Sequence, residues 1–207
     1  MNKKQLMIVW AIAVLFVSQL IIVSFVQAQS VYHNDEGHFS FILPKDWEEL
    51  PQGTIDYISN QARQAGGNAN YITMFQKNSN GIYSRIEIAI SKCGKLTDKA
   101  IRELLNGKDA QAQWQKIGKD MYNKFPPSMA KDFDLGKWEF DKDRNVLFLK
   151  SKEPNPNGTT CTVTADILSS FGFITMNFHV FDDTFDSLLN DYNQIIDSFK
   201  FDEGYRY

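Results

Sequence analysis

Residues 160–180 read TCTVTADILSSFGFITMNFHV, and this stretch decides the fold because its side chains alternate between two faces. Up to residue 168, small and apolar side chains share one parity, while the threonines and Asp166 share the other. After Ser169 and Ser170 the alternation resumes, with His179 at one of the less apolar positions. A period of two residues is typical of a β-strand that buries one face. The stretch therefore predicts two antiparallel strands, joined by a tight turn.

Further strands are predicted on the N-terminal side of this pair. Strand-like runs occur at 39–43, 71–76, 82–91, 135–140 and 145–150. Short runs rich in Asn, Asp, Gly and Pro separate several of them, and such runs form the turns of antiparallel hairpins.

Helical periodicity marks four other segments. The clearest is 185–199, where apolar residues recur every three or four positions and form one continuous face: Phe185, Leu188, Leu189, Tyr192, Ile195, Ile196 and Phe199. Thr97 is placed to cap a helix that ends at Asn106-Gly107, a pair suited to a left-handed cap. Segments 54–65 and 114–125 are also helix-compatible. Together these elements predict an α+β fold, in which helices flank an antiparallel sheet of about six to seven strands.

The N-terminus has the layout of a secretion signal. Two lysines precede an apolar run from Leu6 to Val26, and small residues stand before a cleavage site after Ala28. The apolar run is also about as long as the 20 residues that span a bilayer. Two interpretations stay open: a signal peptide over 1–28 that is removed, or an uncleaved anchor. In both, residues 29–207 form a single domain outside the cytoplasm, periplasmic or secreted.

The charge balance excludes one class of partner. The 207 residues include 22 basic and 25 acidic side chains, a formal net charge of −3, and the signal carries two of the lysines. The exported part is therefore more acidic still, with both signs interspersed, and no nucleic-acid partner is expected. Membrane contact is expected only through an uncleaved N-terminal segment.

Cys93 and Cys161 are the two cysteines, and both lie in the exported part. Export favours a disulfide between them. The alternation places Cys161 on an apolar face, whereas Cys93 follows the polar parity of its strand. A disulfide and a pair of reduced thiols therefore both stay open.

The two ends of the exported part resemble PsbP-like domains, including the bacterial DcrB type. The opening GHFSFILPKDWEE at 37–49 is similar to the family's first strand, with its proline and tryptophan, and IIDSFKF at 195–201 is similar to its final helix and last strand. The resemblance implies a PsbP-like α/β/α sandwich over residues 29–207. It also implies an accessory or binding role without catalysis. The cysteine that anchors lipid-bound members is missing near residue 28.

Few residues are candidates for chemistry. His33, Asp35 and His38 lie close enough in sequence to form a weak candidate metal site, against the alternative of a solvated lead-in segment. His179 could share a pocket with Asp166 on the neighbouring strand. No nucleophile, metalloprotease or phosphate-loop motif is present, so we assign no catalytic residue and no cofactor.

These observations favour an exported, non-catalytic PsbP-like accessory or binding protein with a protein partner in the envelope or outside the cell. The alternatives are a metal-dependent or hydrolytic enzyme that uses the His33/His38 segment or the His179 face, and a small-ligand carrier with an apolar cavity under the last helix.

Cleavage of the signal is directly measurable. If the signal is removed after Ala28, N-terminal sequencing of the exported protein will begin at Gln29. Exported protein that still carries Met1 would establish the anchored form instead.

Overall fold

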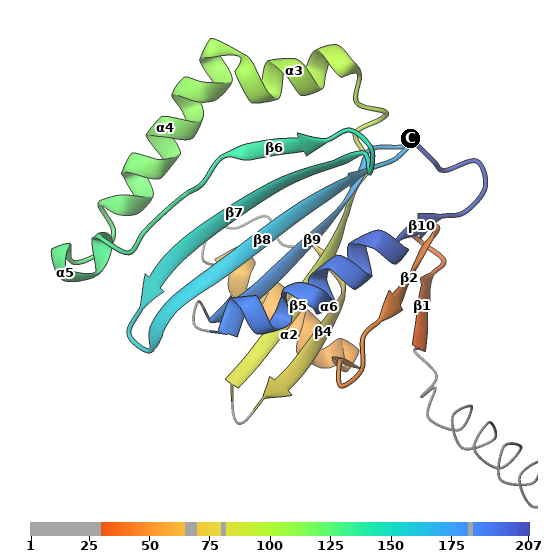
Figure 1. Cartoon of the computed structure of the whole chain (residues 1–207), viewed down its shortest axis with the longest axis horizontal. Coiled ribbons are helices and arrows are strands. Elements are labelled where there is room, and N and C mark those ends of the chain that lie inside the picture. Colours follow the sequence, from red (N-terminus) through yellow and green to blue (C-terminus); the bar gives the residue numbers. More distant parts are fainter. Residues whose placement is uncertain (1–29, 65–69, 80–81, 182–183) are drawn as a thin grey trace, which may run out of the picture. The chain divides into compact units, whose positions relative to one another are not determined.

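A seven-stranded antiparallel sheet organises the chain in the computed structural model, which describes residues 30–64, 70–79, 82–181 and 184–207 (Figure 1). Its strands lie in the order β3-β4-β5-β9-β8-β7-β6. Their bounds are β3 Glu48–Glu49, β4 Tyr71–Ser79, β5 Ile82–Ser91, β6 Trp138–Asp141, β7 Val146–Asn155, β8 Gly158–Leu168 and β9 Phe173–Phe181. The two strands predicted from the alternating stretch are β8 and β9, and they pair in register from Thr160↔Phe181 to Leu168↔Phe173.

A three-stranded sheet joins the two ends of the compact unit Val31–Tyr207. It contains β1 (Ser30–Asn34), β2 (Phe39–Leu43) and β10 (Lys200–Phe201), with β2 in the middle. The predicted strand at 39–43 is β2. The signal predicted over 1–28 lies outside the described residues. Among the described residues, no helix is long and apolar enough to cross a membrane.

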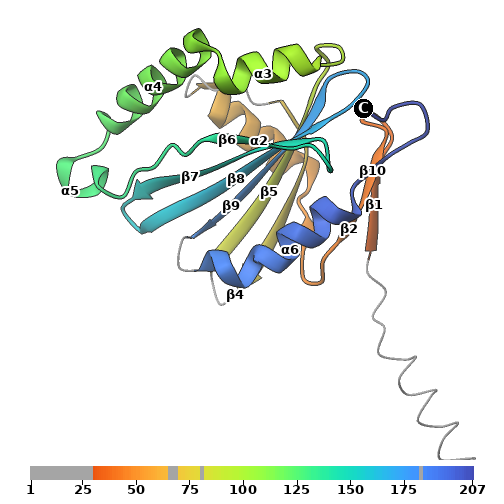
Figure 2. The same ribbon diagram turned by 45° about the horizontal axis from the view of Figure 1, so that its top comes forward.

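Five helices flank the large sheet: α2 (Gln52–Gln64), α3 (Asp98–Asn106), α4 (Lys108–Tyr122), α5 (Pro127–Ala130) and α6 (Phe185–Ser198). Helix α6 and the small sheet lie across one face, while α2 and α3 lie on the other (Figures 1 and 2). This arrangement confirms the predicted α+β class and the antiparallel sheet flanked by helices.

The caps of α3 follow the sequence in one respect and differ in another. Thr97 caps the helix as predicted, since its side-chain oxygen accepts a hydrogen bond from the Ala100 backbone N–H at 3.2 Å. Gly107, however, has φ −66° rather than the left-handed conformation that we predicted. The glycine is needed for space instead, because a Cβ there would clash with the Glu103 carbonyl oxygen.

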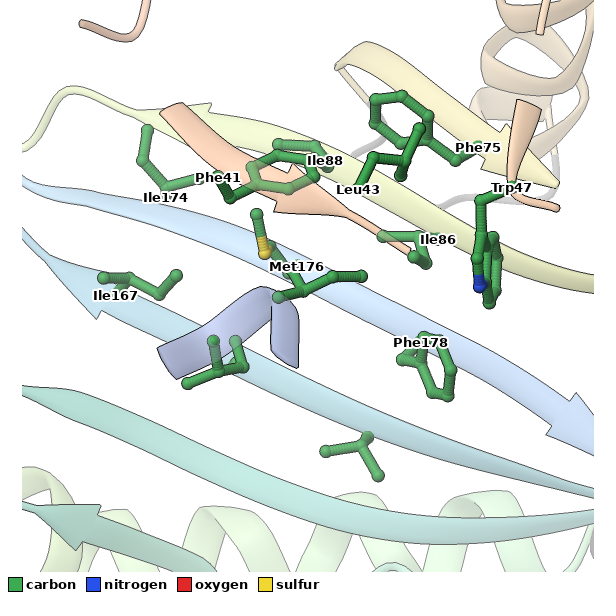
Figure 3. Close-up of a cluster of buried hydrophobic side chains, with 14 of the residues drawn as sticks. Phe41, Leu43, Trp47, Phe75, Ile86, Ile88, Ile167, Ile174, Met176 and Phe178 are labelled. Carbon is green, nitrogen blue, oxygen red and sulfur yellow. The ribbon is translucent and has the colours of Figure 1, made fainter. Parts of the chain in front are cut away.

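The apolar side chains on one face of the strands form the core, together with α6 and the small sheet (Figure 3). Residues of β5, β8 and β9, among them Phe178, pack against aromatic side chains of β2 and β4, among them Phe41 and Phe75. Trp47 closes one end of this core, and its indole N–H donates a 2.8 Å hydrogen bond to Asp191 of α6. The core therefore depends on residues from both ends of the unit.

The predicted disulfide is wrong for this fold. Cys93 is exposed just after β5, whose last residue Ser91 pairs with Phe173 of β9. Cys161 is buried and pairs with Val180, at the other end of β9. At about 3.3 Å per residue, the seven residues between those positions separate the thiols by roughly 23 Å. A disulfide needs Cα atoms within about 7 Å, so the alternative of one buried and one exposed reduced thiol holds.

Two adjacent leucines of α6 provide a matched test of the core. Leu188 is 5% exposed within the core cluster, whereas Leu189 is 37% exposed although the helical pattern placed it on the same apolar face. We expect Leu188→Ala to lower the free energy of unfolding by about 2–4 kcal/mol, through lost burial and a residual cavity. Leu189→Ala should cost less than about 1 kcal/mol. Urea denaturation measures both, and equal losses would contradict the placement of α6.

Candidate functional site

The face of the large sheet opposite the core carries a continuous set of polar side chains, which we call the polar sheet face. It consists of Arg85 and Glu87 from β5, Thr162, Thr164 and Asp166 from β8, and Thr175, Asn177 and His179 from β9. The strand register aligns them in rows, because successive residues of a strand point to opposite faces. One row joins Arg85, His179 and Thr162, and the next joins Glu87, Asn177 and Thr164.

Glu87 is the centre of the polar sheet face. Its side chain is 4% exposed, and its Oε1 lies 2.6 Å from Arg85 Nη2. Its Oε2 lies 3.2 Å from His179 Nε2, an approach that lacks the alignment of a hydrogen bond. On the other side of the ring, His179 Nδ1 is 2.9 Å from the Thr162 hydroxyl. The four side chains therefore form one connected group across three strands.

The surroundings of Glu87 keep it ionised. Burial raises the pKa of Glu87, but the contact and charge of His179, the charge of Arg85 and a hydrogen bond from Tyr71 together outweigh burial and hold the pKa below its ordinary value. Burial and the neighbouring Glu87 charge also raise the pKa of Tyr71, so its hydroxyl stays protonated as a donor. A negative charge is thus fixed in the sheet between Arg85 and His179.

Asp166 forms a separate polar pair on the same face. Burial raises the pKa of Asp166 to about 6, although a 2.6 Å hydrogen bond from the Thr175 hydroxyl opposes that rise. In the next row, the Thr164 hydroxyl donates to Asn177 Oδ1 at 2.8 Å. These pairs cross between β8 and β9, so the three rows that contain Thr162, Thr164 and Asp166 each hold a polar contact.

The hydrogen bonding of the polar sheet face is incomplete. Arg85 Nε and His179 Nε2 are both buried without a hydrogen-bond partner among the described residues. Such groups each cost about 1–3 kcal/mol. Arg85 nevertheless remains 38% exposed as a side chain and His179 28%, so both reach the surface. Hydrogen-bond donors that lack acceptors, beside an exposed guanidinium, are features of a binding surface rather than of a purely structural network.

The order Thr162, His179, Glu87 is also that of a nucleophile, a base and an orienting carboxylate. Thr162, however, lies in the middle of β8, with Ser151 of β7 and His179 of β9 as its partners on either side. Backbone N–H groups of a central strand are used by the sheet ladder. They are therefore not available as the donors that stabilise an oxyanion.

The structure does not gather the predicted metal candidates. His33 Nε2 lies 3.1 Å from Asp35, whose carboxylate is fully exposed. His38 instead lies 3.8 Å from Asp202 and stacks on the Tyr205 ring. Within the described part of the chain, no three His, Cys, Asp or Glu side chains come together as metal ligands.

The predicted pairing of His179 with Asp166 is wrong. The two residues belong to different rows, because Thr162 is the partner of His179 and Thr175 is the partner of Asp166. The carboxylate beside His179 is Glu87, which comes from β5 on the other side of β9. Sequence parity placed Glu87 on a polar face, but only the strand order brings it to His179.

Comparison with solved structures found several chains of similar fold, three of which are described below. PsbP of Synechocystis sp. PCC 6803 is 12% identical, with a TM-score of 0.48, over 86% of this chain and 96% of that one. A protein from Bacteroides thetaiotaomicron has 12% identity and a TM-score of 0.42 over 86% of this chain, which spans only 50% of that protein. LpqN of Mycobacterium tuberculosis, involved in cell envelope biogenesis, has 12% identity and a TM-score of 0.42 over 84% and 90% of the two chains.

The likeness is one of fold. No protein-family model matches the chain. The search of curated proteins found no match either.

The raised pKa of Asp166 predicts a pH-dependent stability. Because its pKa is about 6 in the folded state against an ordinary 3.8, the folded state binds its proton more tightly, and stability is lost as the pH rises from 4 through 6. Asp166→Asn removes this loss. Above pH 7 the free energy of unfolding of the variant should exceed that of the wild type by up to about 3 kcal/mol, and the difference should decline toward pH 4. Urea denaturation across pH measures the difference.

Asp143→Asn, in an exposed turn, is the control for the loss of one carboxylate. Its stability profile should run parallel to that of the wild type. A parallel profile for Asp166→Asn as well would contradict the buried environment of Asp166.

Proposed function

We propose that this chain is an exported, non-catalytic accessory protein of the cell envelope, and that its polar sheet face binds a partner protein. The observation that carries the proposal is the group around Glu87, in which two buried donors lack partners while Arg85 and His179 reach the surface. Arginine is enriched among the residues that dominate the energy of protein interfaces. A partner would supply acceptors to the exposed part of the Arg85 guanidinium and contact the exposed part of the His179 ring.

Packing under α6 argues against the small-ligand carrier. Phe185, Leu188, Ile195 and Ile196 belong to the same buried cluster as the apolar parity of β8 and β9. Side chains therefore occupy the region in which a carrier would hold its ligand. The predicted signal supports a location outside the cytoplasm, in the periplasm or beyond.

Affinity capture tests the proposal. We expect the purified chain from Gln29 onward to retain a specific protein from an envelope extract. The double variant Arg85→Gln/His179→Gln should bind that protein at least about tenfold more weakly, because it removes the guanidinium and the imidazole ring that reach the surface beside Glu87. Arg102→Gln/His33→Gln is the matched control, since it removes the same residue types from exposed positions elsewhere. Retention that is equal in all three proteins would contradict a partner site on the polar sheet face.

The Thr162–His179–Glu87 arrangement makes a hydrolase the second candidate, and an activated nitrophenyl ester tests it. We expect hydrolysis no faster than background, and no change in Thr162→Val or His179→Gln, because the oxyanion donors are missing. A rate above background that disappears in both variants would establish catalysis and overturn the non-catalytic proposal.

A further inference from the structure

A hollow of about 440 Å³ lies away from the polar sheet face, where the end of β8, the β6–β7 turn, β10 and the C-terminal residues meet. Three cationic side chains line it, namely Arg144, Lys200 and Arg206. Leu168, Phe201 and the Tyr207 ring also line it. We call this feature the basic hollow. Its volume falls in the range of about 300–1,000 Å³ that is usual for small-molecule sites.

The positive charge of the basic hollow is only partly neutralised. Arg144 pairs with Asp197 at 2.6 Å and with Asp141 at 3.6 Å. For Lys200 and Arg206, no carboxylate of the described residues lies within ion-pair distance. The chain as a whole is acidic, with a formal net charge of −3. Three cations around one hollow are therefore a local concentration of charge, which favours an anion.

The backbone holds the three cations in place from segments far apart in the sequence. Asp141 Oδ1 accepts hydrogen bonds from the N–H groups of Asp143 at 2.9 Å and Arg144 at 3.1 Å. Lys200 pairs with Ser40 in the small sheet. Arg206 forms an isolated β-bridge with Ser169. Because these positions are fixed before binding, a ligand would not have to order the chain around it.

Apolar groups form the rest of the wall. Leu168 and Phe201 are buried beneath it, whereas Phe199 and Tyr207 are half-buried. The Tyr207 ring is held by a 2.6 Å hydrogen bond from its hydroxyl to the Leu96 carbonyl oxygen. An apolar wall lowers the local dielectric and strengthens charge interactions beside it. The wall also offers apolar contact to a ligand that carries a compact hydrophobic group.

We propose that the basic hollow binds a small organic anion, whose carboxylate or phosphate group meets Arg144, Lys200 and Arg206 and whose compact apolar part contacts Phe199 and Tyr207. Guanidinium groups suit both anions, because they bind carboxylate and phosphate oxygens through paired hydrogen bonds. The basic hollow shares no residue with the polar sheet face, so this site and the proposed partner site can fail independently.

NMR titration of the labelled chain from Gln29 onward tests the site with three probes of similar size: benzoate, phenyl phosphate and neutral benzyl alcohol. We expect at least one anion to shift the backbone amide signals of Leu168 and Phe201 saturably, and benzyl alcohol to leave them unchanged. Lys200→Gln/Arg206→Gln should weaken that binding by about tenfold or more, since two charge-assisted contacts are removed. Raising the salt concentration should also weaken it.

Lys99→Gln/Arg102→Gln is the matched control, because it removes a lysine and an arginine from exposed positions on α3. Tighter binding of phenyl phosphate would assign the natural ligand to phosphate monoesters, and tighter binding of benzoate to carboxylates. Either result supports the proposal. It is overturned if neither anion shifts these signals at about 10 mM, or if the control variant weakens binding as much as Lys200→Gln/Arg206→Gln.

Discussion

The paired ladder of β8 and β9 is the constraint on which the rest of the structure depends. Because both strands alternate and pair without a register shift, the apolar side chains from Cys161 to Ile167 each meet an apolar side chain of β9. A shift of the register by one residue would move the polar side chains of the shifted strand to the core and expose its apolar side chains. The same register that completes the core also aligns Thr162 with His179 and Asp166 with Thr175. Core and polar sheet face are therefore two results of one pairing.

The polar sheet face lowers the stability of the fold, and burial of the apolar core compensates for this loss. Glu87 is desolvated yet charged, and Asp166 is desolvated to the point that its proton is retained to about pH 6. Buried charges stabilise little by themselves, and replacing such groups by apolar ones is often neutral or stabilising. A protein that keeps them on half-exposed strands tolerates this loss of stability, which is the usual balance at functional surfaces.

Periodicity in the sequence predicted the elements well and their neighbours poorly. Strand β2, the β8–β9 pair and the apolar face of α6 follow from local spacing, as does the Thr97 cap. Local spacing does not predict which strand lies beside β9. That strand is β5, and it supplies Glu87. Leu189 shows the same limit, because the apolar stripe of α6 is wider than the part of the helix that is buried against the core. The basic hollow is built from three distant segments, so no local pattern could have indicated it.

The small sheet has a consequence for when the chain can fold. Lys200 and Phe201 pair with Ser40 and Phe39, and the Ser198 hydroxyl accepts a hydrogen bond from the Ile42 N–H, so contacts span almost the entire compact unit. Phe39 and Phe41 are buried only once α6 and β10 are present. Contacts of such high sequence separation form late and slow folding. A growing chain therefore cannot complete its core until nearly all of it has left the ribosome.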